Sequence, residues 1–317
     1  MIYRNELVSI IVRNSSIDKI WLLQGAIDSI EQNIYRPIEV IIVVQTENDN
    51  HIQSVEKIAN NFQNPDFKVK IIINYTSNDE RAKNLNLGIK KSQGRYLGFL
   101  DDDDIIYSNH LQTIINYLQK SKNCSWAYVD VARVLCKSSN NIVTNTKEIE
   151  IISTDYPYNK QEFNYNELLK DNFIPIHSYL IDRDRVDNNI LKFNESMTMM
   201  EDYEFLLRLA FEYNPIHISK VTCEYRFWSD ASNSSFHVNQ LLGINYKSKV
   251  RSWKKASNHI EKLKKQLVPS YSPGLLSYSN RKLILSNFAF IYRMKKRFPK
   301  LWNLMKQSFY KIGLIKY

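Results

Sequence analysis

Glycine is scarce in this chain, with only seven among 317 residues. Neither the GxGxxG fingerprint of dinucleotide-binding folds nor the GxxxxGK[ST] loop of P-loop proteins occurs. Both motifs use glycine because the backbone must approach a phosphate closely. A phosphate-binding protein built without them needs another source of positive charge, and a bound metal ion is one such source.

Cysteine and long apolar runs are also rare. The three cysteines, Cys124, Cys136 and Cys223, lie far apart without a CxxC spacing, which predicts reduced core thiols rather than a zinc site or a disulfide framework. No apolar run reaches the roughly 18 residues of a membrane span. The start of the chain also lacks the pattern of a signal peptide. We therefore expect a cytoplasmic protein, attached at most peripherally to the inner face of the membrane.

Charge is distributed unevenly. Residues 241–317 carry 18 Lys or Arg and one acid, Glu261, whereas residues 1–240 carry 25 basic and 32 acidic residues. A basic, aromatic tail, with a helix expected over 281–298, favours contact with anions such as lipid head groups, a phosphorylated acceptor or nucleic acid. Nucleic acid is disfavoured, because the body is acidic and no known nucleic-acid module occurs. The alternative is a set of ordinary helices that pack on the main domain and expose a basic face.

Apolar runs and helical patterns alternate along the first hundred residues. We expect strands over 7–12, 38–44, 69–73 and 96–100, with helices over 18–34, 52–62 and 79–92 between them, the last ended by Gly94. The runs are too continuous for half-exposed strands, which predicts a parallel sheet covered on both faces. Farther on, we expect a helix over 111–118, strands over 126–134 and 178–181, and a helix from Asp202. The polar stretch 137–165, with a short apolar piece at 149–152, is interpreted as a mobile or excursive segment.

Four consecutive aspartates, Asp101–Asp104, follow the apolar strand that begins at Tyr96. They cannot enter an apolar core, so they must lie at the edge of the sheet, where they repel one another unless a cation neutralises them. A divalent metal is favoured over a solvated acidic turn. Ligands of parallel sheets bind outside the carboxyl ends of the strands, and the other strand ends carry Arg13, Asn14 and the polar segments 45–47 and 74–78.

A second acidic pair, Glu201-Asp202, begins the last predicted helix. The positive end of the helix dipole should keep Asp202 ionised at neutral pH. An ionised carboxylate beside a substrate can take a proton from a hydroxyl. A simple helix cap is the alternative, and it is the commoner role on spacing alone.

In this order, the motifs resemble the family 2 glycosyltransferases of the GT-A fold. Those that carry the resemblance are VSIIV at 8–12, YRPIEVIIV at 35–43, RAKNLNLGI at 81–89, the glycine, strand and aspartates of 94–104, and MEDYEFLLRL at 200–209. The resemblance covers about residues 7–228. It implies an α/β fold with a mixed, mostly parallel sheet flanked by helices, in a domain over 1–235 with a nucleotide-sugar half (1–105) and an acceptor half (106–235). A basic, mainly helical C-terminal extension would follow over 236–317.

The resemblance also implies a reaction. An inverting, metal-dependent transferase would move a sugar from a nucleoside-diphosphate sugar to a hydroxyl of a glycan or lipid-linked oligosaccharide, in surface polysaccharide assembly. Asp202 would be the general base and Glu201 would support the acceptor. Mn²⁺ or Mg²⁺ would bind Asp103, with Asp101 near both the ion and the nucleoside. Asp102 or Asp104 would adjust the metal site. Arg81 and Asn86 would help to place the nucleotide or the loop of aspartates.

Two positions depart from the family pattern. An aspartate that reads the base is common after the second strand, but Gln45-Thr46-Glu47 stands there, so either Glu47 or the amide of Gln45 would take that role. Arg13 stands where a Pro-Thr or Pro-Val pair is more usual, and it would contact a phosphate or a carboxylate. Two histidines stay ambiguous: His237 is either a third metal ligand or simply exposed, and His177 either contacts the acceptor or makes a core hydrogen bond.

Two other functions remain open. A catalytically degenerate module of the same fold would bind nucleotide or glycan without turnover, and the missing base-reading aspartate favours it. A sugar nucleotidyltransferase is also α/β and metal-dependent, but it would ordinarily have a glycine-rich, basic first loop, and residues 13–18 contain no glycine.

Overall fold

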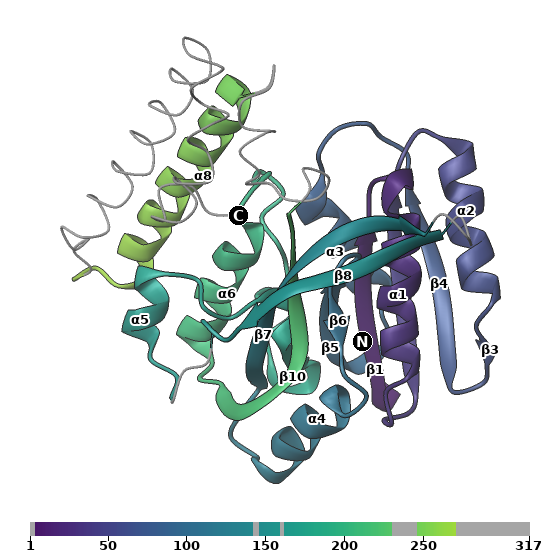
Figure 1. Cartoon of the computed structure of the whole chain (residues 1–317). Coiled ribbons are helices and arrows are strands. Elements are labelled where there is room, and N and C mark those ends of the chain that lie inside the picture. Colours follow the sequence, from purple (N-terminus) through teal and green to yellow (C-terminus); the bar gives the residue numbers. More distant parts are fainter. Residues whose placement is uncertain (1–3, 142–145, 159–161, 230–245, 271–317) are drawn as a thin grey trace.

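The protein is built around one mixed ten-stranded sheet (Figure 1). The structure, a computed structural model, describes residues 4–141, 146–158, 162–229 and 246–270. The strand order is β3-β4-β2-β1-β5-β9-β7-β10-β6, and β8 pairs with β7 outside this path. The strands are β1 (Arg4–Asn14), β2 (Ile38–Gln45), β3 (Gln63–Asn64), β4 (Phe67–Asn74), β5 (Gly94–Asp101), β6 (Ile105–Ile106), β7 (Trp126–Asn141), β8 (Thr146–Asp155), β9 (Tyr179–Asp182) and β10 (Ile216–Trp228).

The amino-terminal half has the predicted parallel arrangement. Strands β4, β2, β1 and β5 are parallel neighbours, and they are connected by α1 (Ile20–Glu31), α2 (Asp49–Asn60) and α3 (Arg81–Lys91). Helices α1, α2 and α4 (His110–Lys120) pack on one face of the sheet. The opposite face is covered by α3, α5 (Tyr165–Lys170), α6 (Glu201–Glu212) and α8 (Tyr246–Leu267).

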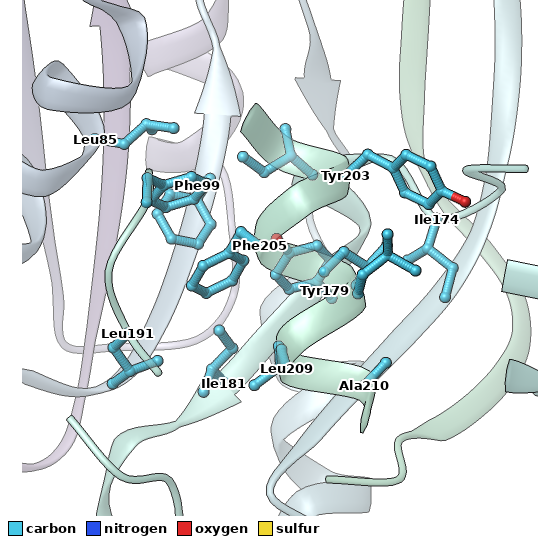
Figure 2. Close-up of a cluster of buried hydrophobic side chains, with 14 of the residues drawn as sticks. Leu85, Phe99, Ile174, Tyr179, Ile181, Leu191, Tyr203, Phe205, Leu209 and Ala210 are labelled. Carbon is cyan, nitrogen blue, oxygen red and sulfur yellow. The ribbon is translucent and has the colours of Figure 1, made fainter. Parts of the chain in front are cut away.

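Successive side chains of each central strand enter opposite cores. On β1, Ile10 and Val12 pack with α1 and α2, whereas Ile11 packs with α3 and α6. On β5, Phe99 points to the α6 face, where its ring meets Phe205 edge to face with ring centroids 6.2 Å apart (Figure 2). Burial on both faces explains why the strands are continuous apolar runs, since alternation would place polar groups in one core.

The carboxyl-terminal half is antiparallel in part. Strand β9 runs antiparallel to both β5 and β7, and β10 pairs parallel to β7 and antiparallel to β6. The polar stretch 137–165 differs from the excursion that we expected, because β7 continues to Asn141 and β8 returns beside it to form a long hairpin. Most residues of β8 are polar, and its isoleucines, Ile149, Ile151 and Ile152, are exposed. The hairpin was missed because β8 belongs to no buried core.

Gly94 does not end the helix that precedes it. Helix α3 ends at Lys91 with an extended residue, Ser92, as its cap, and Gly94 opens β5. A Cβ atom on Gly94 would lie 2.6 Å from both Leu7 O and Ser9 Oγ. The glycine is therefore needed for the close approach of β5 to β1 rather than for a left-handed helix cap.

The basic extension begins with a helix that packs on the main domain. Ala256, Ile260 and Leu263 of α8 are buried in the core that contains α6, and α8 lies beside α6 in Figure 1. The helix expected over 281–298 lies outside the described residues. None of the helices in the described ranges is both long and apolar enough to span a bilayer.

Candidate active site

The polar strand ends meet at one edge of the sheet, as expected for parallel strands. Asn14 of β1 pairs in register with Val44 of β2, and Arg13 pairs with Asp101 of β5. The acidic turn, defined as Asp101–Asp104, therefore starts beside the end of β1. Both segments are at the carboxyl ends of their strands, where α/β sheets bind ligands.

Strand alternation decides which partner each aspartate meets. Arg13 and Asp101 follow Ile11 and Phe99 by two residues, so they share the face that carries α6. There Arg13 donates from Nη2 to Asp101 Oδ1 at 2.6 Å and from Nη1 to Glu201 Oε1 at 2.8 Å. Arg13 thus joins the acidic turn to the first residue of α6.

Asp102 lies toward the opposite face of the sheet, on the side of α1 and α2. Its Oδ2 accepts a 2.6 Å hydrogen bond from Asn14 Nδ2, and Asn14 Oδ1 lies 2.5 Å from His51 Nε2 on α2. Lys19, which immediately precedes α1, places its Nζ 3.4 Å from Asp102 Oδ1 and 3.0 Å from Asp103 Oδ2. The same ammonium therefore serves two neighbouring carboxylates.

Asp104 is a structural member of the turn. It is only 1% exposed, its Oδ2 lies 3.1 Å from His177 Nδ1, and its Oδ1 accepts a 2.8 Å hydrogen bond from the backbone N–H of Arg226 on β10. Burial alone would lower the pKa of His177, but the Asp104 carboxylate raises it well above its usual value. Of the two roles considered for His177, the structure therefore supports the core interaction.

The chain itself supplies cations to the acidic turn, which the charge argument from sequence did not anticipate. Arg13 and Lys19 face the first three aspartates, although a metal was the neutralising ion we expected. Lys19 was missed because it follows the strand by five residues, and only the 3-10 turn Ile17–Lys19 returns it to the strand end. The sequence signal that could have identified Lys19 was its positive charge in the loop after the first strand.

The carboxylates of the turn have unequal proton affinities. Burial would raise the pKa of Asp101, but the adjacent Arg13 guanidinium lowers it below its ordinary value. For Asp103, burial raises the pKa to about 8, because the charge of Lys19 offsets only part of that burial and of the repulsion from the other aspartates. The Lys19 ammonium therefore compensates the charge of Asp103 only in part.

The acidic pair of α6 is where the sequence placed it. Glu201 is buried and bound by Arg13, while Asp202 is half-buried and accepts a 3.2 Å hydrogen bond from Asn172 Nδ2. Burial and the neighbouring Glu201 charge raise the pKa of Asp202 to about 6. Desolvation therefore outweighs the helix dipole in setting the direction of the pKa shift at Asp202. Asp202 is still mostly ionised at neutral pH.

The metal expected from the sequence finds a partial fit. Within the described part of the chain, no three His, Cys, Asp or Glu side chains form a ready-made metal site. Mg²⁺ is commonly held by one or two carboxylates together with substrate phosphates, and Mn²⁺ likewise prefers oxygen ligands. Asp101 and Asp103 supply such oxygens, each beside a cation of the chain. They fit a divalent ion whose site is completed by another molecule. His237, the candidate third ligand, lies outside the described residues.

Gln45 and Glu47, which were predicted for the donor site, both make hydrogen bonds with the segment between β4 and α3. Gln45 Oε1 accepts hydrogen bonds from Glu80 N and Asn84 Nδ2, while its Nε2 donates to Asn78 O. Gln45 thus fixes the segment between β4 and α3. Glu47 accepts a 3.1 Å hydrogen bond from the backbone of Ser77 in that same segment.

Arg81 and Asn86 lie on α3 at different distances from the acidic groups. Arg81 binds both carboxylate oxygens of Asp79 at 3.1 Å, and the charge of Glu201 also reaches it: burial would lower the Arg81 pKa, but these acids raise it. Asn86 lies about one turn farther along α3. Its side chain makes hydrogen bonds with the backbone N–H and C=O of Phe193 instead. The structure therefore brings Arg81 to the site and does not bring Asn86 to the aspartates.

Known structures share this fold. The S. aureus TarS 1-349 complex with UDP-GlcNAc aligns with 74% of this chain and 64% of its own, with a TM-score of 0.54 and 16% identity. The Pyrobaculum calidifontis mannosyltransferase PcManGT, in complex with GDP-Man and Mn²⁺, aligns with 91% of this chain and 84% of its own, with a TM-score of 0.51 and 13% identity. At these identities, the likeness shows the fold alone.

Sequence similarity extends to the family level. An uncharacterized glycosyltransferase of Haemophilus influenzae is 28% identical over 191 residues, which are 59% of this chain and 65% of that protein. Residues 9–187, more than half of the chain, match the family profile described as glycosyl transferase family 2. The chain therefore belongs to glycosyl transferase family 2.

Proposed function

We propose that this protein transfers a sugar, with inversion, from a nucleoside-diphosphate sugar to a hydroxyl group of a glycan or lipid-linked oligosaccharide. The observation that carries the proposal is the Arg13 bridge, which holds the acidic turn and the amino end of α6 at one site. A donor diphosphate at the turn and an acceptor hydroxyl at Asp202 would then meet across this bridge. The TarS and mannosyltransferase structures, which hold UDP-GlcNAc and GDP-Man, support a nucleotide sugar as donor.

In the proposed reaction, Asp202 takes the proton of the acceptor hydroxyl. The acceptor oxygen forms a bond to the anomeric carbon from the face opposite the diphosphate, and the bond from that carbon to the phosphate oxygen breaks. The nucleoside diphosphate leaves with the electron pair, so a Walden inversion results. A carboxylate with a pKa of about 6 suits this role, because a base works best when its pKa lies near the working pH.

The remaining residues orient the reactants. Asp103 and Asp101 would hold Mn²⁺ or Mg²⁺, which stabilises charge on the departing diphosphate when bound. Arg13 keeps Glu201 in place beside the acceptor base, and Arg81, which the charge of Glu201 reaches, would contact a phosphate or the nucleoside. Since Gln45 and Glu47 are both engaged with residues 77–84, they would contribute to base recognition chiefly by shaping that segment.

The decisive experiment measures nucleoside-diphosphate release from a panel of UDP-, GDP-, CDP- and dTDP-sugars, with and without Mn²⁺. We expect turnover with one nucleotide class and stimulation by the ion. Nucleotide binding without release for every donor would favour the degenerate binding module. Nucleoside-triphosphate consumption with pyrophosphate release would favour a sugar nucleotidyltransferase instead.

Membrane contact is a separate part of the proposal. Residues 241–317 carry 18 basic residues and one acid, whereas residues 1–240 carry more acids than bases, and basic, aromatic segments bind anionic lipid surfaces. Such contact would suit a lipid-linked acceptor and a surface polysaccharide product. Removal of residues 281–317 should reduce sedimentation with phosphatidylglycerol vesicles but not with phosphatidylcholine vesicles. Equal sedimentation of both forms with the anionic vesicles would sink the membrane assignment.

A further inference from the structure

Lys19 occupies an unexpected position in the acidic turn. Its Nζ lies 3.0 Å from Asp103 Oδ2 and 3.4 Å from Asp102 Oδ1, and its side chain is 22% exposed. Arg13 contacts Asp101 on the opposite side of the strand end. Among the described residues, Lys19 is therefore the cation that forms an ion pair with Asp103.

The position of Lys19 conflicts with a metal ion on Asp103. A divalent ion bound by a carboxylate lies about 2.1 Å from the oxygen. With the ammonium 3.0 Å from the same carboxylate, the two cations would be neighbours within about 5 Å, at a largely buried site where their repulsion is poorly screened. The free protein can hold both only if Lys19 moves or if further negative charge arrives.

A donor diphosphate supplies that negative charge. It offers anionic oxygens both to an ion on Asp103 and to a nearby ammonium, so the two cations need not share one carboxylate. Lysine suits such an exchange, because its flexible stem and single charged head can leave one anion for another without a fixed geometry. Arg13 is held by two acids and lacks this freedom.

We propose that Lys19 is an internal countercation of the acidic turn that competes with the divalent ion in the free enzyme and moves to the diphosphate of the donor. This inference rests on the proposed function, since it takes the turn to be the diphosphate site. It makes donor and metal binding cooperative: each relieves the charge conflict that opposes the other. It also gives Lys19 two effects of opposite sign, on metal affinity and on metal-free nucleotide affinity.

The test uses the full chain and two binding measurements. Mn²⁺ affinity is measured without nucleotide by electron paramagnetic resonance of the free ion, and UDP and GDP affinities are measured by calorimetry in EDTA. Lys19→Met should bind Mn²⁺ about tenfold more tightly than the wild type and bind the preferred nucleoside diphosphate about tenfold more weakly. Lys19→Arg, which keeps the charge, should stay near the wild type in Mn²⁺ affinity.

Lys170→Met is the matched control, because it removes a lysine–carboxylate pair of even shorter distance, 2.6 Å to Glu167, at an exposed place. It should change neither affinity. Lys19→Gln provides a second neutral variant, and thermal unfolding verifies that each variant is folded. Unchanged or weaker Mn²⁺ binding by both neutral variants would overturn the proposal, as would Lys19→Arg binding Mn²⁺ as tightly as Lys19→Met.

The Mn²⁺ measurement needs no turnover, so its outcome is separate from that of the proposed reaction. If sugar transfer is observed but the neutral Lys19 variants bind Mn²⁺ no more tightly than the wild type, only the proposed role of Lys19 is disproved. If Lys19→Met gains Mn²⁺ affinity while no donor is turned over, the transferase proposal fails and the countercation remains.

Discussion

The acidic turn and the amino end of α6 both present adjacent carboxylates, but the fold treats them differently. Asp101 and Asp103 lie beside cations supplied by Arg13 and Lys19. Asp202 is bound by a neutral amide, and its nearest basic group, Arg13, contacts Glu201 instead. The turn thus holds its carboxylates against cations of the chain, whereas burial and the neighbouring Glu201 charge raise the pKa of Asp202 to about 6.

Of the changes that test this difference between the two regions, removal of the proposed base should have the largest effect, and it should act on the transfer rate. Asp202→Asn keeps the shape and the contact with Asn172 but cannot accept a proton, so the transfer rate should fall by about 10²–10⁴-fold. Donor binding should change little, because the turn is intact. Glu212→Gln at the far end of α6 serves as the control, and single-turnover kinetics with a fluorescence measurement of nucleotide binding separate the two effects. Retention of full transfer by Asp202→Asn would remove Asp202 from the mechanism.

Loss of the bridge between the two regions should mainly affect stability. Arg13→Met leaves Glu201, 3% exposed, and Asp101 without their cation. Stranding one member of a buried ion pair costs about 3–5 kcal/mol, which urea denaturation would measure. The exposed pair of Arg133 and Asp155 provides the control.

Arg133→Met should cost at most about 1 kcal/mol, because exposed ion pairs contribute little. If both arginine variants lose the same small amount of stability, the bridge has no structural role.

Two neighbouring aspartates should respond in opposite ways. Asp104→Ala removes the partner of His177 and the acceptor for Arg226 N, so it should lower the free energy of unfolding by about 2–4 kcal/mol. Asp103→Asn relieves repulsion within the turn, and it should leave the stability unchanged or raise it while weakening Mn²⁺-dependent donor binding. Denaturation and nucleotide calorimetry on the same two variants provide the measurement. Equal destabilisation by both would contradict separate roles for Asp103 and Asp104.

The pH dependence of the rate should show the smallest effect. Asp202 acts only when deprotonated, so activity is present above its pKa of about 6 and is lost as the pH falls through that value. The rate should fall about tenfold for each pH unit below this point. Profiles of kcat/KM between pH 5 and 8 locate the inflection, and a value that stays constant down to pH 5, as expected for an ordinary aspartate pKa of about 3.9, would show that desolvation does not tune this group.

Much of the amino-terminal half could be predicted from the pattern of residues. Buried runs such as Ile38–Val44 predicted parallel strands because only a sheet covered on both faces accommodates them. The ends of those strands then had to share one edge, which located Arg13 and the acidic turn. The β7–β8 hairpin was missed because its exposed strands have the polar composition of a loop.

The sequence by itself determined the strand–helix order, the acidic turn at the end of β5 and the placement of Glu201-Asp202 at the start of a helix, because each depends on local periodicity and on charges that cannot enter a core. Only the tertiary structure decided which charge faces which. Register placed Arg13 beside Asp101, the turn before α1 returned Lys19 to Asp103, and packing of β10 buried Asp104. Desolvation likewise depends on every neighbouring segment at once, and it raised the pKa of Asp202 to about 6 despite the helix dipole.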